Sequence, residues 1–158
     1  MRILAAESRR WYFAYGSNMN TEQLENRIGR RGVSWKIACL PGYELVFDKP
    51  SCDGTGYANI RVKAEATVYG VLYELTEPEL RKLDAYEGVP RHYRREKIVA
   101  VLEDGERVVA ETYIAVLTRE VLRPSEGYLS RIIEGAEEHG LPADYIEGLR
   151  RRAYGGCH

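Results

Sequence analysis

Asp104 and Gly105 stand between two segments of alternating apolar and polar residues, at about 92–102 and 106–117. An Asp-Gly pair in this setting is the strongest short-range signal for a β-hairpin, because both residues tolerate the positive φ values of a tight turn. The chain therefore contains at least one pair of antiparallel strands. Apolar runs bounded by turn residues predict further strands at about 11–15, 36–47 with a break at Pro41-Gly42, 57–63 and 66–75.

Helix-start and helix-stop residues lie between and after these strands. Thr76 and Glu79 form a capping-box pattern before a helix at about 77–87, which Gly88 ends. Further helices are predicted where Asn20 with Gln23 caps a short segment closed by Gly29 and Gly32, from Pro124-Ser125 to about Glu138, and from Pro142 to about Arg152. Many strands, one internal helix and two terminal helices predict an α+β fold, a small mostly antiparallel β-barrel with flanking helices.

Length and composition limit the classes of protein that this chain can be. Its 158 residues suit one domain, predicted at 11–158 after a short charged leader at 1–10. A net charge of −1 gives no overall field that attracts nucleic acid or an anionic membrane, so we expect neither as a partner. No apolar run approaches the roughly 20 residues that cross a bilayer. Three cysteines without a paired spacing suit a reducing cytoplasm, and a homodimer stays open.

The segment Tyr15-Gly16-Ser17-Asn18 lies between the first predicted strand and a helix start. Gly16 permits a sharp turn with no Cβ in the way, and the N–H groups from Ser17 onward then point free of the helix. Together with the Ser17 hydroxyl and the Asn18 amide, these groups suit a carboxylate, a phosphate or a developing oxyanion. The alternative is a plain strand–turn–helix connection with Asn18 as the cap.

Glu87 occupies the last turn of the predicted 77–87 helix. A carboxylate is disfavoured there, because the C-terminal end of a helix carries partial negative charge. That dipole and any burial raise the pKa of a carboxyl above its reference value near 4.3. A raised pKa is what a general acid/base working near neutrality needs. The alternative interpretation is a solvated glutamate among the many in this chain.

Other polar and aromatic residues give weaker signals. Some of the 12 tyrosines are candidates for a pocket wall, with packing at the core edge as the alternative, namely Tyr93, Tyr113 and Tyr128. The histidines have no spacing typical of a metal site, and no glycine-rich phosphate or dinucleotide motif is present, so we expect neither metal nor cofactor. A solvated basic face is expected from Arg27, Arg30 and Arg31.

Together these segments resemble the γ-glutamylcyclotransferase family over about residues 11–150. The match begins with Tyr12-Phe13-Ala14-Tyr15-Gly16-Ser17-Asn18-Met19 and reaches Leu83-Asp84-Ala85-Tyr86-Glu87-Gly88-Val89. In the family's order it also includes Gly70-Val71-Leu72-Tyr73-Glu74-Leu75, Tyr93, Pro124-Ser125 with Tyr128, and Gly140-Leu141-Pro142 with Tyr145. The first tetrapeptide joined to a later Asp-x-x-Glu-Gly is a strong signal for this family.

The resemblance implies a small β-barrel flanked by helices, with a cavity at one end and no metal or cofactor. The family's loop binds the γ-glutamyl part of the substrate, and its positions here are Tyr15, Gly16, Ser17 and Asn18. The glutamate of the family's Glu-Gly pair is the acid/base, which implies that role for Glu87. Tyr93 and Tyr128 match family tyrosines near the pocket.

The resemblance also implies a reaction, the intramolecular cyclisation of a γ-glutamyl group to 5-oxoproline. Relatives specific for glutathione carry a Gly-Ser-Leu variant of the loop, and relatives acting on γ-glutamylamines a Gly-Thr-Leu variant. This chain has Gly16-Ser17-Asn18, which favours γ-glutamyl-amino acids, although residues 47–60 look more like microbial members than animal ones. The alternatives are γ-glutamyl-amines, a carrier-linked γ-glutamyl group, or a non-catalytic small-molecule-binding protein of the same fold.

Overall fold

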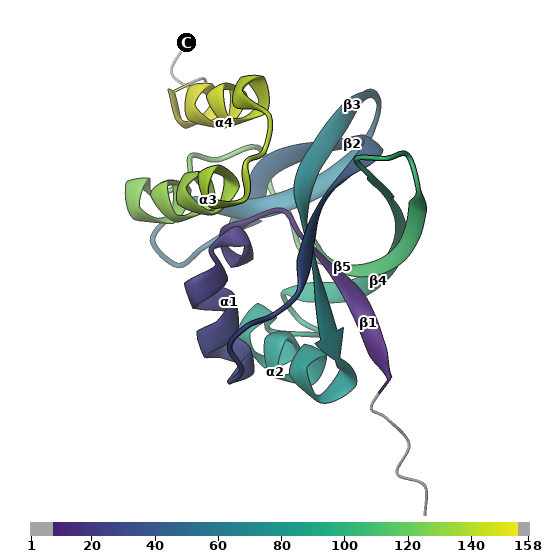
Figure 1. Cartoon of the computed structure of the whole chain (residues 1–158). Helices are drawn as coiled ribbons and strands as arrows, with labels where there is room; N and C mark the ends of the chain where they lie inside the picture. Colours follow the sequence, from purple (N-terminus) through teal and green to yellow (C-terminus); the bar gives the residue numbers. More distant parts are fainter. Residues whose placement is uncertain (1–7, 155–158) are drawn as a thin grey trace, which may run out of the picture.

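A closed barrel of five strands forms the centre of the computed structural model, which describes residues 8–154. The strands follow one another around the barrel in the order β1-β3-β2-β4-β5 (Figure 1). Their bounds are β1 (Arg9–Ala14), β2 (Trp35–Pro50), β3 (Gly56–Thr76), β4 (Tyr93–Leu102) and β5 (Arg107–Ala115). Neighbouring strands are antiparallel except β1 and β5, which close the barrel in parallel. The predicted α+β fold with a mostly antiparallel barrel is confirmed.

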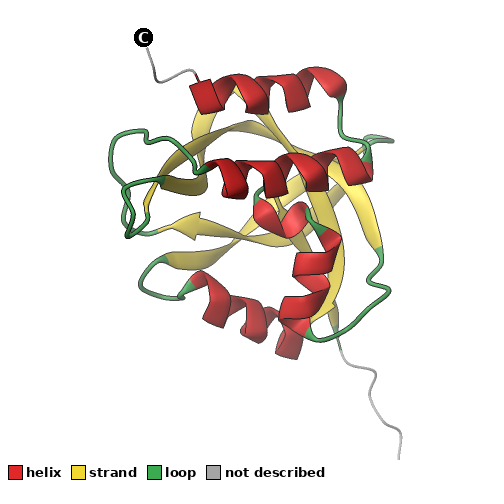
Figure 2. Ribbon diagram, turned by 90° about the vertical axis from the view of Figure 1, so that its left-hand side faces the viewer, coloured by secondary structure: helices red, strands yellow, loops and turns green. Residues whose placement is uncertain are grey.

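The helical segments lie together on one side of the barrel (Figure 2). They are the 3-10 turn η1 (Ser17–Met19) and the helices α1 (Thr21–Ile28), α2 (Glu77–Glu87), α3 (Glu126–His139) and α4 (Ala143–Tyr154). Helix α1 packs on α2, and α3 packs on both η1 and α4. Within residues 8–154, no helix is long and apolar enough to cross a membrane. The short turn η1 is thus enclosed by the barrel and its neighbouring helices.

Strands β2 and β3 run further than the sequence predicted. β2 continues through Pro41-Gly42, where Gly42 adopts a φ of 84° and the pairing with β3 shifts its register. The predicted break at this point is wrong, because a bulge absorbs the irregular residues while the strand goes on. β3 joins the segments predicted separately at 57–63 and 66–75, because its pairing with β2 extends along both of them.

Strand β1 begins at Arg9, within the segment 1–10 that was expected to be a leader. The first part of that segment, residues 1–7, lies outside the described residues. The second half of β1 enters the core, where Phe13 has no exposed surface. Gly70 of β3 permits this close packing, because a Cβ there would clash with the Ala14 carbonyl and the Phe13 ring. β1 therefore leads directly from the core into the 15–18 turn.

Helix α2 begins and ends where the sequence predicted. Thr76 Oγ1 accepts a hydrogen bond from the Glu79 N–H at 3.3 Å, and Glu79 Oε1 accepts one from the Thr76 N–H at 2.9 Å, which completes the capping box. Gly88 ends the helix with a φ of 66°. Arg30 Nε also donates to Glu79 Oε2 at 2.6 Å, so a charged pair fixes α1 to α2. These contacts set the position of Glu87 at the end of α2.

Candidate active site

A pocket of about 490 Å³ opens beside the 15–18 turn and the end of α2. This volume is within the range of small-molecule sites. All barrel strands and the helices α1, α2 and α3 contribute to its wall. The pocket brings together the residues predicted for the site, which are Tyr15, Gly16, Ser17, Asn18, Glu87, Tyr93 and Tyr128. Segments separated by most of the chain's length therefore meet at one cavity.

The 15–18 turn leads into the 3-10 turn η1, which uses only some of its backbone N–H groups in hydrogen bonds. The Met19 N–H donates to the Gly16 carbonyl and the Asn20 N–H to the Ser17 carbonyl, each at 3.0 Å. The first N–H groups of such a turn have no acceptor within it, and those of Ser17 and Asn18 have none elsewhere in the described part of the chain. Gly16 has a φ of −116°, and a Cβ there would lie 3.5 Å from the Tyr128 hydroxyl. The absence of a side chain at Gly16 thus leaves this space in the pocket open.

The side chain of Asn18 holds several site residues at once. Its Nδ2 donates to Tyr12 Oη at 3.0 Å and to Glu87 Oε1 at 3.4 Å. Its Oδ1 accepts from Gln23 Nε2 and from Arg27 Nη1, both at 3.1 Å. These four bonds use the full capacity of an amide side chain. The amide thus lines the pocket with its hydrogen bonds directed to the protein, and a role of Asn18 in substrate binding stays a prediction.

The capping box predicted for α1 forms only in part. Asn20 Oδ1 accepts from the Gln23 N–H at 3.0 Å, as predicted. The Gln23 side chain, however, donates to Ser17 Oγ at 2.8 Å and to Asn18 Oδ1 instead of reaching back to the Asn20 backbone. The Gln23 side-chain amide therefore bonds acceptors in the 15–18 turn and does not complete the capping box of α1. Gln23 thus supports the turn from α1.

Glu87 has the environment of a carboxyl that exchanges protons near neutrality. Burial raises its pKa to about 7, against lowering by the positive charge of Arg27 and the hydrogen bond from Asn18, while the charge of Asp84 adds to the rise. Its position at the negative end of α2 acts in the same direction. Among the described residues only Asn18 bonds its carboxyl, through Oε1, so Oε2 is left for the pocket. Such a group can accept and return a proton.

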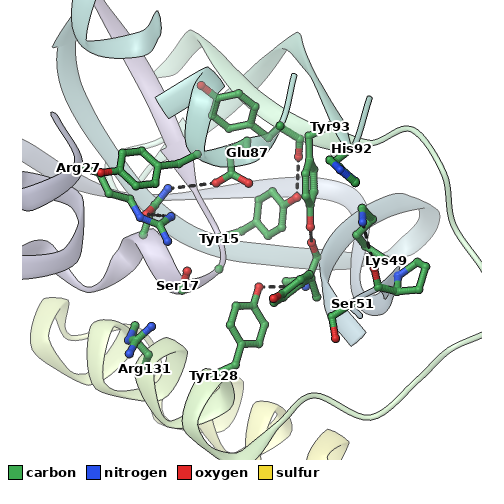
Figure 3. A pocket seen from close by; sticks show the side chains of 18 of the residues that line it. Tyr15, Ser17, Arg27, Lys49, Ser51, Glu87, His92, Tyr93, Tyr128 and Arg131 are labelled. Atoms are coloured by element: carbon green, nitrogen blue, oxygen red, sulfur yellow. Dashed lines mark hydrogen bonds between the residues drawn. The ribbon is translucent and has the colours of Figure 1, made fainter. Parts of the chain in front are cut away.

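Arg27 lines the pocket, although the sequence predicted that it lies on a solvated basic face. Its guanidinium lies 4.9 Å from the centre of the Tyr86 ring, and it lines the cavity near Glu87 (Figure 3). The expected solvated basic face is wrong for Arg27, and also for Arg30, which pairs with Glu79. A signal was present, because Arg27 follows the buried Leu24 by three residues and so lies at the edge of the buried helix face.

Tyrosines form much of the pocket wall, and the hydroxyls of three of them are bonded to the barrel backbone. Tyr15 donates to the Tyr113 carbonyl at 2.5 Å, and Tyr93 donates to the Ala58 carbonyl at 2.8 Å. Tyr128 accepts from the Ala58 N–H at 3.0 Å. Burial, followed by the charge of the nearby Glu87 carboxylate, raises the pKa of Tyr15 well above its usual value. The predicted Tyr93, Tyr113 and Tyr128 all line the pocket.

The far wall of the pocket was not predicted from the sequence. It is built from the ends of β2 and β3 and from the 51–55 loop that joins them. Ser51, Asp53 and Thr55 hydrogen-bond one another within this loop. Lys49 precedes it and also faces the cavity, opposite Arg27 (Figure 3). No sequence motif marks Lys49, since its burial depends on how β2 and β3 pair.

The described residues contain no group of three or more His, Cys, Asp or Glu side chains that could hold a metal ion.

His139, on α3, hydrogen-bonds the start of α1 and the last residue of η1. Its Nε2 lies 3.0 Å from the Met19 carbonyl and 2.9 Å from Thr21 Oγ1. Burial lowers its pKa, which favours the neutral ring. His139 thus ties α3 to the segment that follows the 15–18 turn.

Several known proteins similar to this chain are named γ-glutamylcyclotransferase. The profile of the AIG2-like family matches residues 67–149. The γ-glutamylcyclotransferase of Bos taurus is 31% identical over 144 residues, which cover 87% of this chain and 76% of that protein. The chain belongs to the γ-glutamylcyclotransferase family. The enzyme of that name from Homo sapiens is 30% identical over 145 residues, covering 88% of this chain and 76% of that protein.

Solved structures of the γ-glutamylcyclotransferase family agree with this assignment. One titled as a γ-glutamyl cyclotransferase superposes with a TM-score of 0.82 at 29% identity, covering 90% of this chain and 87% of that one. A yeast γ-glutamyl cyclotransferase described as specific to glutathione has a TM-score of 0.66 at 11% identity, covering 93% of this chain and 96% of that one, and shares the fold. The predicted family is thus confirmed, and the chain is an enzyme of the γ-glutamylcyclotransferase type.

Proposed function

We propose that this enzyme cyclises the γ-glutamyl group of γ-glutamyl-amino acids to 5-oxoproline and releases the free amino acid, with Glu87 as its acid/base. The observation that carries the proposal is the carboxyl of Glu87, whose pKa is raised to about 7 beside a turn with spare N–H donors. Proton acceptance and proton donation are both accessible to such a group near neutral pH.

The substrate brings its own nucleophile, the α-amine of the glutamyl group. Glu87 accepts a proton from the α-ammonium, and the freed amine attacks the γ-carbonyl carbon. A carbon–nitrogen bond forms and closes the lactam ring, while the bond from the γ-carbon to the leaving nitrogen breaks. Glu87 returns its proton to that nitrogen as the bond breaks. The ring nitrogen sheds a second proton when it becomes the lactam N–H, and Glu87 passes this proton to the released amine too, so the amino acid leaves as an ammonium ion. The carboxyl ends in its starting state, and no covalent enzyme intermediate forms.

Positioning supplies the rest of the rate enhancement. A glutamyl chain is flexible. When the enzyme holds the amine against the γ-carbonyl, the substrate is already in a near-attack conformation, and this lowers the barrier to ring closure. The spare N–H groups of Ser17 and Asn18 are suited to an oxygen that gains negative charge on the γ-carbon. The Ser17 hydroxyl can add a donor beside them. Arg27 supplies positive charge on the same side as Glu87 (Figure 3).

Amino acids are the leaving groups that the sequence favours. The Gly16-Ser17-Asn18 turn differs from the variants found in relatives specific for glutathione or acting on γ-glutamylamines. A γ-glutamyl-amine or a carrier-linked γ-glutamyl group would react by the same chemistry. The alternative of a non-catalytic binding protein is not supported, because binding alone gives no reason to bury a carboxyl at a helix C-terminus.

The deciding experiment is release of 5-oxoproline from γ-glutamyl-amino acids, γ-glutamyl-amines and glutathione, with Glu87→Gln as the control. Release from the amino-acid series that is lost in the variant supports the proposal. Release from only the amines or glutathione supports the proposed reaction but shows that γ-glutamyl-amino acids are not the substrate class. A folded wild-type protein that releases no 5-oxoproline from any of them overturns the proposed function.

A further inference from the structure

Lys49 is a buried cation in the wall of the pocket. It lies at the end of β2, just past a register shift in the pairing with β3, and only 6% of the residue is exposed. Its Nζ donates to the Pro50 carbonyl at 3.0 Å, and this is its one hydrogen bond with the described residues. None of the acidic side chains described forms an ion pair with it. Asp48, its neighbour, is buried but does not line the pocket.

This arrangement leaves Lys49 with unused binding capacity. An ammonium group has three donors, and one of them is satisfied by Pro50. A buried charge costs free energy unless it is paired with an opposite charge and hydrogen-bonded. Because no carboxylate of the described protein meets that need, the pocket side of Lys49 suits an anionic group on a ligand. Neighbouring Ser51 also lines the cavity, but its hydroxyl donates to Asp53 within the 51–55 loop, so Lys49 is the donor on this side.

The location of Lys49 indicates which part of a ligand it meets. Figure 3 has Lys49 and Ser51 at one side of the cavity and Arg27 and Ser17 at the other, with Tyr15 between them. A γ-glutamyl-amino acid carries a carboxylate at each of its two ends. When the glutamyl end folds against Glu87 and the 15–18 turn, the leaving amino acid extends away from them.

We propose that Lys49 binds the carboxylate of the leaving amino acid and thereby makes the enzyme selective for γ-glutamyl-amino acids over γ-glutamyl-amines. This inference rests on the proposed function. It deepens that function by naming a specificity-determining residue outside the 15–18 turn and Glu87. The residue belongs to the 47–60 segment, which has no role in the proposed reaction steps.

The other cations of the pocket are less suited to this task. Arg27 is already bonded to Asn18 and stacked over Tyr86, on the Glu87 side. Arg131 is exposed on α3, where water satisfies its charge. Lys49 is buried and has no ion-pair partner among residues 8–154, so of the three cations it gains most from an anionic group on the substrate.

The expected effect is a loss of discrimination between two substrates that differ by one carboxylate. γ-Glutamylalanine and γ-glutamylethylamide form such a pair, because ethylamine is alanine without its carboxylate. We expect wild type to prefer the alanine substrate in kcat/KM by roughly 10- to 100-fold, the usual effect of a charge-assisted hydrogen bond. The carboxylate keeps its charge throughout the reaction, so the preference arises mainly in KM.

The experiment measures 5-oxoproline release from both substrates by wild type, Lys49→Met, Lys49→Arg and Lys63→Met. Lys63 is exposed on β3 and lies outside the pocket, which makes it a matched control. Lys49→Met should remove most of the preference, Lys49→Arg should keep part of it, and Lys63→Met should behave as wild type. Thermal unfolding of each variant verifies that it is folded.

Several outcomes overturn the inference. Lys49→Met that keeps the full preference shows that another residue reads the carboxylate. Equal losses on both substrates show that Lys49 acts on the glutamyl part or on the fold. If Lys49→Met does not fold, the wild-type enzyme alone tests the inference. Equal wild-type kcat/KM values for the two substrates would show that the enzyme does not select for the carboxylate. A wild type inactive on every γ-glutamyl substrate fails at the proposed function itself, which is a distinct result.

Discussion

Asn18 donates its side-chain amide to Oε1 of Glu87 across 3.4 Å and so joins the turn after β1 to the last turn of α2. The same amide group accepts a hydrogen bond from Arg27, whose positive charge lowers the Glu87 pKa. The proton affinity of Glu87 therefore depends on groups from three separate elements. This dependence makes the site testable by pH as well as by substitution.

Replacing Glu87 with glutamine removes the proton acceptor and keeps the shape of the side chain. We expect Glu87→Gln to fold and to lose turnover by at least about 100-fold, in line with usual general acid/base contributions. The measurement is kcat for 5-oxoproline release, with circular dichroism as the check on folding. Activity within a fewfold of wild type would sink the assignment of Glu87.

Replacing Ser17 with alanine tests a residue that supports the reaction without carrying the proton. Ser17→Ala removes one hydroxyl donor, while the backbone N–H groups of Ser17 and Asn18 remain. We therefore expect a smaller fall in kcat than for Glu87→Gln, measured side by side. A fall as large as that of Glu87→Gln contradicts the idea that backbone donors carry most of the oxyanion stabilisation.

The pH dependence of kcat/KM should follow the ionisation of Glu87. As a base Glu87 must be deprotonated, so the rate rises with pH and is half-maximal near 7, the value to which burial raises its pKa. Arg27→Met removes the main lowering influence, so the midpoint of the rise should move to higher pH. Arg31→Met is the matched control, because Arg31 is exposed and lies outside the pocket. An unchanged midpoint in Arg27→Met contradicts the electrostatic account.

The stability of the protein should also carry the signature of Glu87. Its folded-state pKa of about 7 lies above the reference of 4.5, so the folded state binds the proton more tightly than the unfolded state. The stability this gives is fully present below about pH 4.5 and is lost as pH rises through about 7. Glu87→Gln avoids that loss. We expect its melting temperature to exceed that of wild type by at least about 2 °C at alkaline pH, with a smaller gap in acid.

The contact between α3 and η1 can be tested at Gly135. A Cβ on Gly135 would clash with the backbone of Met19 and Asn20, so Gly135→Ala must push α3 away from the turn. We expect this to cost about 1–3 kcal/mol of stability, the usual price of overpacking, and to lower kcat/KM. Gly148→Ala on α4 is the control, since no atom of the described residues lies within 4 Å of a Cβ there. Equal behaviour of the two variants contradicts a tight α3–turn contact.

Local signals predicted what local interactions determine. The bounds of α2 follow from a capping box and a terminal glycine within a dozen residues, and both formed as expected. Gln23 fitted the same local pattern, but its side chain found stronger partners in the 15–18 turn. A cap pattern alone cannot reveal such competitors, because they come together only when β1, η1 and α1 are folded.

The features that the sequence did not reveal depend on long-range pairing. β2 continues through Pro41-Gly42 because β3 pairs with it on both sides of the bulge. That pairing also carries Lys49 into the pocket wall, far from the motifs at the 15–18 turn. Burial of a lysine has no pattern in a single sequence, since it is decided by the register of two strands.

The two walls of the pocket differ in how freely they can evolve. The 15–18 turn shares its hydrogen bonds with α1 and α2, and Met19, which follows it, lies against the α3 backbone, so a change there disturbs several elements together. The 51–55 loop hydrogen-bonds within itself at the connecting end of the β2–β3 hairpin. Selection for a new leaving group can act on Lys49 and the loop beside it while the proton-transfer chemistry is inherited unchanged, so members of this family should diverge in substrate there first.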